Sequence, residues 1–355
     1  MTALPLSLYD ADREALAELM AGEPKFRVDQ LWRALHVDFA PLSEISTLPA
    51  ALRSRLADEL PESLEWKAEQ TDATGDTVKF LWNLRNGGHP IETVLMLYPD
   101  RATVCVSTQA GCAMACGFCA TGQAGFNRHL SSGEIVEQVV KAARRARGMG
   151  RRVSNIVFMG MGEPLANEVA VHSAVRRIHD DIGISARHLT ISTVGIIPGI
   201  RQLAAWSLPV NLAVSLHAAR NELRDELVPI NKRYPIDDLV AACNDYLNER
   251  HRRVSFEWAL IDRVNDTRRD ANELARLCKR LRPAAHVNLI PLNPTPGWPT
   301  RGSSAARVRE FADTLVSLGV NATVRRNRGT DIDAACGQLA AGQTITPVSF
   351  GRDDR

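Results

Sequence analysis

Short apolar segments alternate with amphipathic ones from about residue 103 to about residue 326, and this alternation leaves few folds open to the chain. Segments rich in Val, Ile and Leu predict strands at 103–107, 155–160, 189–194, 211–217, 254–260, 287–292 and 322–326. Helices are predicted to begin near Ser132, Asn167, Pro198, Asp237, Thr267 and Ser303. The pattern predicts a parallel α/β sheet or barrel, in which ligand chemistry lies at the carboxyl ends of the strands.

The first hundred residues have a different pattern. Apolar spacing predicts helices over Asp10–Met20, 25–37 and Pro49–Glu59, followed by a linker at 59–65. Strands at 77–84 and 91–98 flank Asn86-Gly87-Gly88, which is a good hairpin turn. We therefore expect a small helical N-terminal domain over 1–70, a hairpin linker region over 71–100, a core over 101–345 and a tail over 346–355.

Composition excludes several classes of protein. The opening residues turn acidic and polar too early for a signal peptide, and no run of about 18 apolar residues could span a membrane. A cytoplasmic protein is therefore expected. The net charge is only +2, but arginines and lysines gather in three clusters, at 141–152, 250–253 and 325–328. Such clusters either contact phosphates or are solvated helix ends and loops.

Seven cysteines in a chain of this size argue against a disulfide framework and favour metal or redox chemistry. Cys112, Cys116 and Cys119 lie within eight residues, in a glycine-bearing loop just after a predicted strand. Three thiolates can hold a [4Fe–4S] cluster and leave one iron open for another ligand. Zinc is the alternative, because His129 could complete a tetrahedral site.

The C-x-x-x-C-x-x-C triplet, with Phe118 before the third cysteine, resembles the radical-SAM signature, and GCAMACGFCATGQAGFNRHLSSGEI resembles the RlmN/Cfr family of RNA adenine methyltransferases. The resemblance implies an α/β fold, a partial (β/α)6-type radical-SAM barrel with a small helical N-terminal domain and a connecting β-hairpin. It also implies two cofactors, one [4Fe–4S] cluster held by Cys112, Cys116 and Cys119, and S-adenosyl-L-methionine (SAM).

Several strand ends resemble the SAM-contacting positions of this family. Glu163, in GMGEP, could pair with the ammonium group of SAM, and the neighbouring glycines would let the backbone approach the ligand closely. The full set implied by the resemblance is Gly162, Glu163, Ser192, Ser215, Leu216, His217 and Asn293. Where the family commonly has STSG, this chain has STVG at 192–195, which puts only the local loop in doubt.

Cys105 and Cys336 resemble the two additional functional cysteines of the family. The implied mechanism uses two SAM molecules: Cys336 is methylated, its methyl carbon is activated and added to adenine, and Cys105 then releases the product by forming a disulfide with Cys336. Glu92 aligns with a family glutamate proposed as proton acceptor, although Cys105 could take the proton instead. Cys243 and Cys278 lie in helical patterns and are expected in the core.

The resemblance further implies methylation of C2 of an adenosine in the peptidyl-transferase region of 23S rRNA, and of an adenosine beside the tRNA anticodon. The alternatives are a Cfr-type C8 methyltransferase that confers antibiotic resistance, a radical-SAM enzyme of another kind, and a non-catalytic, metal-stabilised RNA-binding protein. The expected partners are RNA, gripped by the N-terminal domain and the basic clusters, and an external reductant for the cluster and the Cys105–Cys336 disulfide. No membrane partner is expected, and a monomer is favoured.

Overall fold

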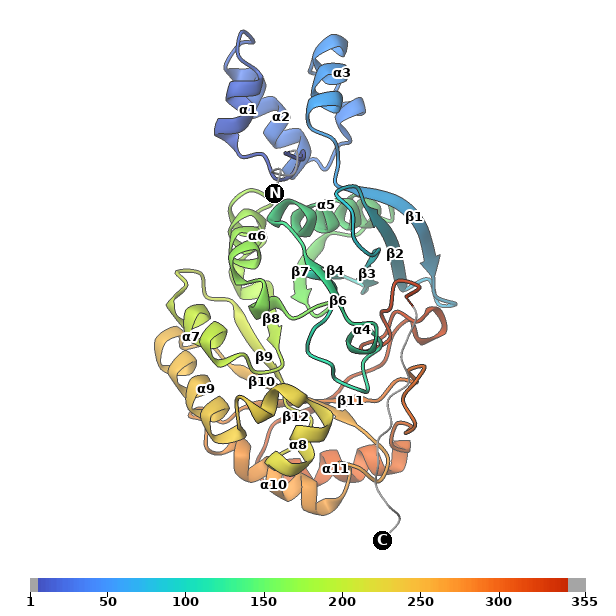
Figure 1. Cartoon of the computed structure of the whole chain (residues 1–355), viewed down its shortest axis with the longest axis vertical. Coiled ribbons are helices and arrows are strands. Elements are labelled where there is room, and N and C mark those ends of the chain that lie inside the picture. The colour runs from blue at the N-terminus through green and yellow to red at the C-terminus, as the bar shows by residue number, and fades with distance from the viewer. Residues whose placement is uncertain (1–5, 344–355) are drawn as a thin grey trace.

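The computed structural model describes residues 6–343 and is built around one mixed sheet of ten strands (Figure 1). The strand order is β1-β2-β3-β4-β7-β8-β9-β10-β11-β12. In this sheet β4 and β7 to β12 run parallel to one another, and β1 to β4 pair antiparallel. This arrangement confirms the predicted α/β fold. The tail expected at 346–355 lies outside the described residues.

The parallel strands coincide closely with the apolar segments of the sequence. Their bounds are β4 Ala102–Cys105, β7 Val153–Phe158, β8 Leu189–Thr193, β9 Asn211–Ser215, β10 Val254–Leu260, β11 His286–Pro291 and β12 Ala322–Val324. Side chains are buried nearly throughout β4 and β10, whereas on β7 and β8 half-buried positions lie among the buried ones. A second sheet pairs β5 (Gln109–Gly111) with β6 (Phe126–His129), just before and after the cysteine triplet.

Helices connect the parallel strands and lie on the outside of the curved sheet (Figure 1). They are α5 Ser132–Gly148, α6 Glu168–Asp180, α7 Ile197–Ala205, α9 Ile236–Arg250, α10 Arg268–Cys278 and α11 Ala305–Ser317. The predicted capping box at the start of α5 is present, since Ser131 and Glu134 each bond the other's backbone N–H. Two short helices were not predicted, α4 (Ala120–Gln123) and α8 (Asn221–Leu227).

Three antiparallel strands extend the sheet beyond β4. They are β1 (Leu64–Thr71), β2 (Thr77–Leu84) and β3 (Ile91–Leu97), and the last two confirm the predicted hairpin. The segment expected to be a linker at 59–65 runs instead into β1, which pairs with β2 along its whole length. The sheet therefore begins at Leu64, inside the segment 1–70 that was expected to form the small helical domain with its linker.

The N-terminal helices α1 (Arg13–Leu19), α2 (Phe26–His36) and α3 (Ala50–Glu59) stand at one end of the molecule, next to α5 and α6 (Figure 1). The basic cluster of α5 holds this end together. Arg144 and Arg147 donate to the carbonyls of Phe39 and Asp38, each at 2.6 Å. Lys141 and Arg145 form ion pairs with Glu62 and Glu69. Most of the first basic cluster is thus engaged within the protein rather than free for RNA.

In the part of the chain that the structure describes, no helix combines the length and the apolar character needed to cross a membrane.

His36 lies in the buried contact between α2 and α6. Its ring stacks on Trp32 with centroids 4.2 Å apart, and its Nδ1 lies 3.1 Å from the Trp32 carbonyl. Its Nε2 lies 3.3 Å from Arg177, which can only donate, so the ring is neutral with its proton on Nδ1. Burial, and then the charge of Arg177, lower the pKa of His36 to about 4.

This environment predicts acid sensitivity. The unfolded chain binds a proton at His36 below pH 6.5 and the folded chain does so only near pH 4, so stability is lost as the pH falls through this window. The loss is up to about 3 kcal/mol. Replacing His36 with Gln should flatten the pH dependence of the unfolding free energy, measured with denaturant, whereas the same change at the exposed His89 should leave it unaltered.

Candidate active site

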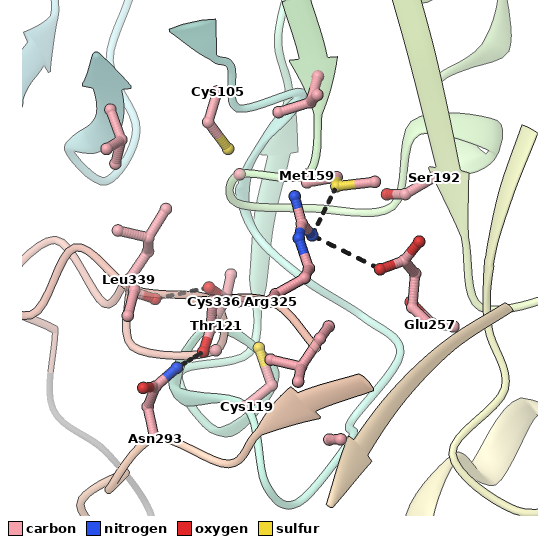
Figure 2. Close-up of a pocket in the computed structure, with 18 of the residues that line it drawn as sticks. Cys105, Cys119, Thr121, Met159, Ser192, Glu257, Asn293, Arg325, Cys336 and Leu339 are labelled. Carbon is pink, nitrogen blue, oxygen red and sulfur yellow. Dashed lines mark hydrogen bonds and ion pairs between the residues drawn. The ribbon is translucent and has the colours of Figure 1, made fainter. Parts of the chain in front are cut away.

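A cavity of about 470 Å³ opens at the carboxyl ends of the parallel strands, which is a size typical of small-molecule sites. The structure brings most of the sequence-predicted site residues into its wall. Those that line it are Cys105, Cys112, Cys116, Cys119, Gly162, Glu163, Ser192, Ser215, His217, Asn293 and Cys336. Figure 2 shows Cys105, Cys119, Ser192, Asn293 and Cys336 around this space. Glu92 and Leu216 are not part of the lining.

The cysteine triplet lies in the loop between β5 and α4. The loop turns tightly at Gly111, where a Cβ atom would lie 2.0 Å from the Gly125 carbonyl oxygen, so only glycine fits. Backbone bonds from Cys112 to Gly125 and from Cys119 to Cys116 hold its shape. Burial raises the pKa of the Cys112 thiol to about 12. This thiol therefore stays protonated unless a metal displaces the proton.

Three cysteines suit an iron–sulfur cluster, which accepts three protein thiolates, whereas structural zinc needs a fourth protein ligand. Within residues 6–343, no three His, Cys, Asp or Glu side chains are grouped for a single metal ion. His129, the possible fourth zinc ligand, lies on β6 and bonds the Gln109 side chain at 3.0 Å. The thiolates of an iron–sulfur cluster bind different irons, so they need not converge on one point.

Glu163 follows β7 and is almost fully buried. Its carboxylate accepts hydrogen bonds from the backbone N–H groups of Leu165 (3.1 Å) and Val194 (2.9 Å), and so connects the ends of β7 and β8. Burial raises its pKa to about 7. A cationic partner in the cavity would offset this burial and favour the ionised carboxylate.

The glycines of the GMGEP segment also lie close to other parts of the protein itself. A Cβ at Gly160 would lie 2.7 Å from the Val106 carbonyl oxygen, and one at Gly162 would lie 2.6 Å from the Gln109 side chain. These close approaches are made to residues 106–109, the segment that leads through β5 into the cysteine loop.

His217 follows β9 and is held in one tautomer. Its Nδ1 accepts a hydrogen bond from the Ala259 N–H at 2.9 Å, so the ring proton lies on Nε2. Burial and the charge of Arg224 lower its pKa to about 3, which keeps the ring neutral. His217 is thus a fixed neutral donor in the cavity wall. Its neighbour Leu216 is fully buried and contributes backbone contacts instead.

Sequence reasoning missed Arg224, a fully buried arginine on α8. Its guanidinium donates to the carbonyls of Val194, Ser215 and Leu216 and to the Asn231 side chain. These bonds join the ends of β8 and β9, where the predicted SAM-contacting residues lie. No local motif marks this arginine, because the carbonyls it serves belong to other segments.

Cys105 and Cys336 reach the cavity from widely separated parts of the chain. Cys105 ends β4, and burial raises its pKa to about 12. Cys336 is exposed toward the cavity, while the surrounding protein desolvates its thiolate and raises its pKa to about 11. Both cysteines are free thiols.

Arg325 is a second residue that sequence reasoning did not assign to the site. Its guanidinium lies 3.5 Å from Glu257 and 3.9 Å from the sulfur of Met159 (Figure 2). Its positive charge lowers the pKa of Cys105 and of Cys336, against the larger effect of burial. The arginine is therefore the cation that faces both thiols.

The carrier loop, defined here as residues 333–341, holds Cys336 against the rest of the site. Asn293 donates its side-chain amide to the Cys336 carbonyl at 3.0 Å (Figure 2). The Ala120 N–H and the Thr121 hydroxyl donate to the carbonyls of Gly337 and Leu339. One side of the carrier loop is thus attached directly to the segment that follows Cys119.

Glu92 lies next to this loop. Its carboxylate pairs with Lys79 at 3.0 Å and accepts the Ala341 N–H at 3.0 Å. It shares a face of β3 with Val94 and Met96, which do line the cavity. The Glu92 carboxylate therefore contacts the end of the carrier loop.

Known proteins resemble this chain over nearly its whole length. Residues 106–278 match the model of the Radical SAM superfamily. A protein of Chloroflexus aurantiacus named "Probable dual-specificity RNA methyltransferase RlmN" is 50% identical over 352 residues, which cover 95% of this chain and 93% of that protein. A protein of Mycobacterium marinum with the same name is 49% identical over 344 residues, covering 95% and 94% of the two chains. The crystal structure of a radical SAM methyltransferase from Sphaerobacter thermophilus matches with a TM-score of 0.91 at 49% identity, covering 95% of this chain and all of that one.

Replacing Arg224 with Met should damage both stability and the site. Several buried carbonyls would lose their donor, so the free energy of unfolding should fall by about 3 kcal/mol or more. Arg201 on α7 offers a control, because its ion pair with Asp245 is exposed on both sides. Its replacement by Met should cost about 0–1 kcal/mol. Denaturant unfolding of the two variants measures the difference, and equal losses would contradict the role given to Arg224.

Proposed function

The chain belongs to the RlmN family of radical SAM RNA methyltransferases, and from that premise we propose that it methylates C2 of an adenosine in the peptidyl-transferase region of 23S rRNA. We further propose that it methylates an adenosine beside the anticodon of tRNAs. The enzyme is a SAM-dependent RNA methyltransferase. The methylated base atom, the RNA sites and the transfer of the methyl group through Cys336 are proposed here. The observation that carries it is that Cys105 and Cys336 line the same cavity as the cysteine triplet.

Membership of the radical SAM superfamily implies SAM and a [4Fe–4S] cluster. In the proposal, Cys112, Cys116 and Cys119 hold the cluster. The SAM-binding residues are Gly162, Glu163, Ser192, Ser215, Leu216, His217 and Asn293. When bound, the cluster and SAM supply a methyl group and, in a second use, a deoxyadenosyl radical. The buried Glu163 carboxylate and the neutral His217 offer an acceptor and a donor of fixed orientation to the ligand.

Cys336 is the proposed methyl carrier. With SAM bound, its thiolate would attack the methyl carbon of one SAM molecule and release S-adenosylhomocysteine. A deoxyadenosyl radical from a second SAM would then take a hydrogen atom from the S-methyl group. The activated carbon forms a bond to C2 of the adenine. C2 is electron-poor and does not attack a sulfonium, so a carrier of this kind supplies chemistry that direct methyl transfer lacks.

Cys105 completes the proposed cycle. After the adduct has lost one electron and its C2 proton, the Cys105 thiolate attacks the Cys336 sulfur. The bond between carbon and the Cys336 sulfur breaks, the released CH2 group takes a proton to become the methyl group of the base, and a disulfide remains. External thiols must reduce this disulfide before the next turnover, because neither cysteine is a free thiol while the disulfide lasts.

The placement of the two candidate proton acceptors favours one of them. Cys105 lines the cavity, whereas the carboxylate of Glu92 is occupied by Lys79 and by the Ala341 N–H. A group that takes a proton from the base must lie within hydrogen-bond reach of it. We therefore favour Cys105 over Glu92 for this step.

The third basic cluster supports RNA entry at the cavity. Arg325, Arg326 and Arg328 follow the edge strand β12 and line the cavity. Arg326 is exposed, and among residues 6–343 its side chain has no hydrogen-bond or ion-pair partner. A free guanidinium at the rim is suited to an RNA phosphate.

Mass spectrometry of the protein purified from cells tests the carrier. The peptide containing Cys336 should carry one added methyl group, and replacing Cys336 with Ala should abolish RNA methylation. Nucleoside analysis should then show 2-methyladenosine in the rRNA and tRNA of cells that carry the gene, and this base should be missing from cells that lack it. Finding 8-methyladenosine instead would refute C2 as the target, and an unmodified Cys336 in active enzyme would refute the carrier route.

Replacing Cys105 with Ala should separate the two halves of the cycle. Cys336 should still be methylated, because that step needs no second thiol. Product release should fail, so the protein should remain covalently bound to RNA through Cys336. Denaturing gel electrophoresis with labelled RNA detects this adduct. The same change at Cys278, a buried core cysteine on α10, should leave no adduct.

A further inference from the structure

The Lys79–Glu92 ion pair is buried where the proposed reaction gives it no direct part. Both side chains are at most 10% exposed, and their charged atoms lie 3.0 Å apart. Lys79 lies on β2 and Glu92 on the neighbouring strand β3, two residues out of direct register and on the same face. Such a pair contributes little net stability, because removing two charges from water costs about as much as their attraction returns.

The pair reaches the two ends of the carrier loop. The Lys79 ammonium lies 3.4 Å from the Asp333 carbonyl oxygen, at the start of the loop. The Glu92 carboxylate accepts the Ala341 N–H at 3.0 Å, at its end. Cys336 lies between these two points. The charges therefore hold the first and last residues of the segment that carries the proposed methyl acceptor.

The backbone of the carrier loop is strained at the same two residues. Asp333 and Ala341 both have φ of +52°, a left-handed conformation that is unfavourable for residues with a Cβ atom. Such a conformation persists when its surroundings hold it in place. The two polar contacts to Lys79 and Glu92 fall where the loop needs that support.

The opposite side of the carrier loop is held by different groups. Ala120, Thr121 and Asn293 bond its central carbonyls, which orients Cys336 relative to the cysteine triplet. Lys79 and Glu92 hold the two ends of the carrier loop, and these residues hold its middle. With both attachments, the Cys336 sulfur has a defined position relative to the triplet and to Cys105.

We infer that Lys79 and Glu92 are positioning residues, a buried charge pair that holds the ends of the carrier loop so that Cys336 can reach both its methyl donor and Cys105. The inference rests on the proposed function, because it assigns the pair a role in presenting the methyl carrier. It gives Glu92 a task that differs from proton transfer, and it makes Lys79 its equal partner.

Two single variants test the pairing. Replacing Lys79 with Met leaves a buried carboxylate without its counter-charge, so Glu92 should no longer hold Ala341, and replacing Glu92 with Gln weakens the same contact. In both, hydrogen exchange of the peptide covering 333–341 should be about tenfold faster, the factor that corresponds to losing one charge-assisted hydrogen bond. Replacing Glu65 with Gln, which breaks an exposed pair with Arg85 in the same sheet, is the control and should change nothing.

A third variant separates positioning from general stability. Replacing Lys79 with Met and Glu92 with Leu together removes both charges and restores an apolar interior, so global unfolding should return to the wild-type value. The ends of the carrier loop would still lack their partners. Exchange at 333–341 should therefore stay fast, and methylation of Cys336 from SAM in the absence of RNA should stay about tenfold slow.

The outcomes distinguish the possible roles. If Glu92 acts only as proton acceptor, replacing it with Gln leaves Cys336 methylation unchanged and the Lys79 variant behaves as wild type, which overturns the inference. Recovery of loop exchange and Cys336 methylation in the double variant also overturns it, in favour of a structural role alone. Absence of any methyl group on wild-type Cys336 refutes the carrier route instead, while loop exchange still decides whether the pair holds the loop.

Discussion

Main-chain N–H and carbonyl groups are buried at the carboxyl ends of the parallel strands. The cavity keeps its shape because side chains from outside the sheet form hydrogen bonds with these groups. Gln138 of α5 bonds both the N–H and the carbonyl of Ser107. Arg224 serves three carbonyls, and Asn265 bonds Ile261, Ala259 and His217. An unpaired buried polar group costs about 1–3 kcal/mol, so these contacts fix where each strand ends. These hydrogen bonds therefore also determine the positions of the residues that line the cavity.

Much of the fold follows from the sequence because its causes are local. Val and Ile concentrate in the parallel strands, and turn and cap residues separate them from the helices, so β8 and β10 fall almost where periodicity places them. The cysteine triplet and the strand-end residues likewise converge, since parallel strands bring their carboxyl ends to one edge. β1 escaped prediction because its central residues are mostly exposed and rich in Glu, Lys and Gln, which are poor strand formers.

What the sequence could not show depends on contacts between distant segments. The α5 arginines have the composition of a phosphate-binding patch, yet their partners are carbonyls and carboxylates of the N-terminal segment. The sequence shows only that Glu92 belongs to a predicted strand. Its environment depends on the register of β2 and β3 and on the carrier loop. Arg224 has no motif at all. In each case the tertiary partner, rather than the residue type, determines the role.

The carrier loop gives the order of synthesis a physical meaning. Its contact between Thr121 and Leu339 joins residues 218 apart in the chain. Since a ribosome adds roughly 5–20 residues per second, the cysteine triplet leaves the exit tunnel about ten seconds or more before Leu339 does. Throughout that interval one wall of the cavity does not yet exist, and the thiols face solvent on the side that the loop later covers. A newly made molecule thus exposes its cysteine triplet before it encloses it.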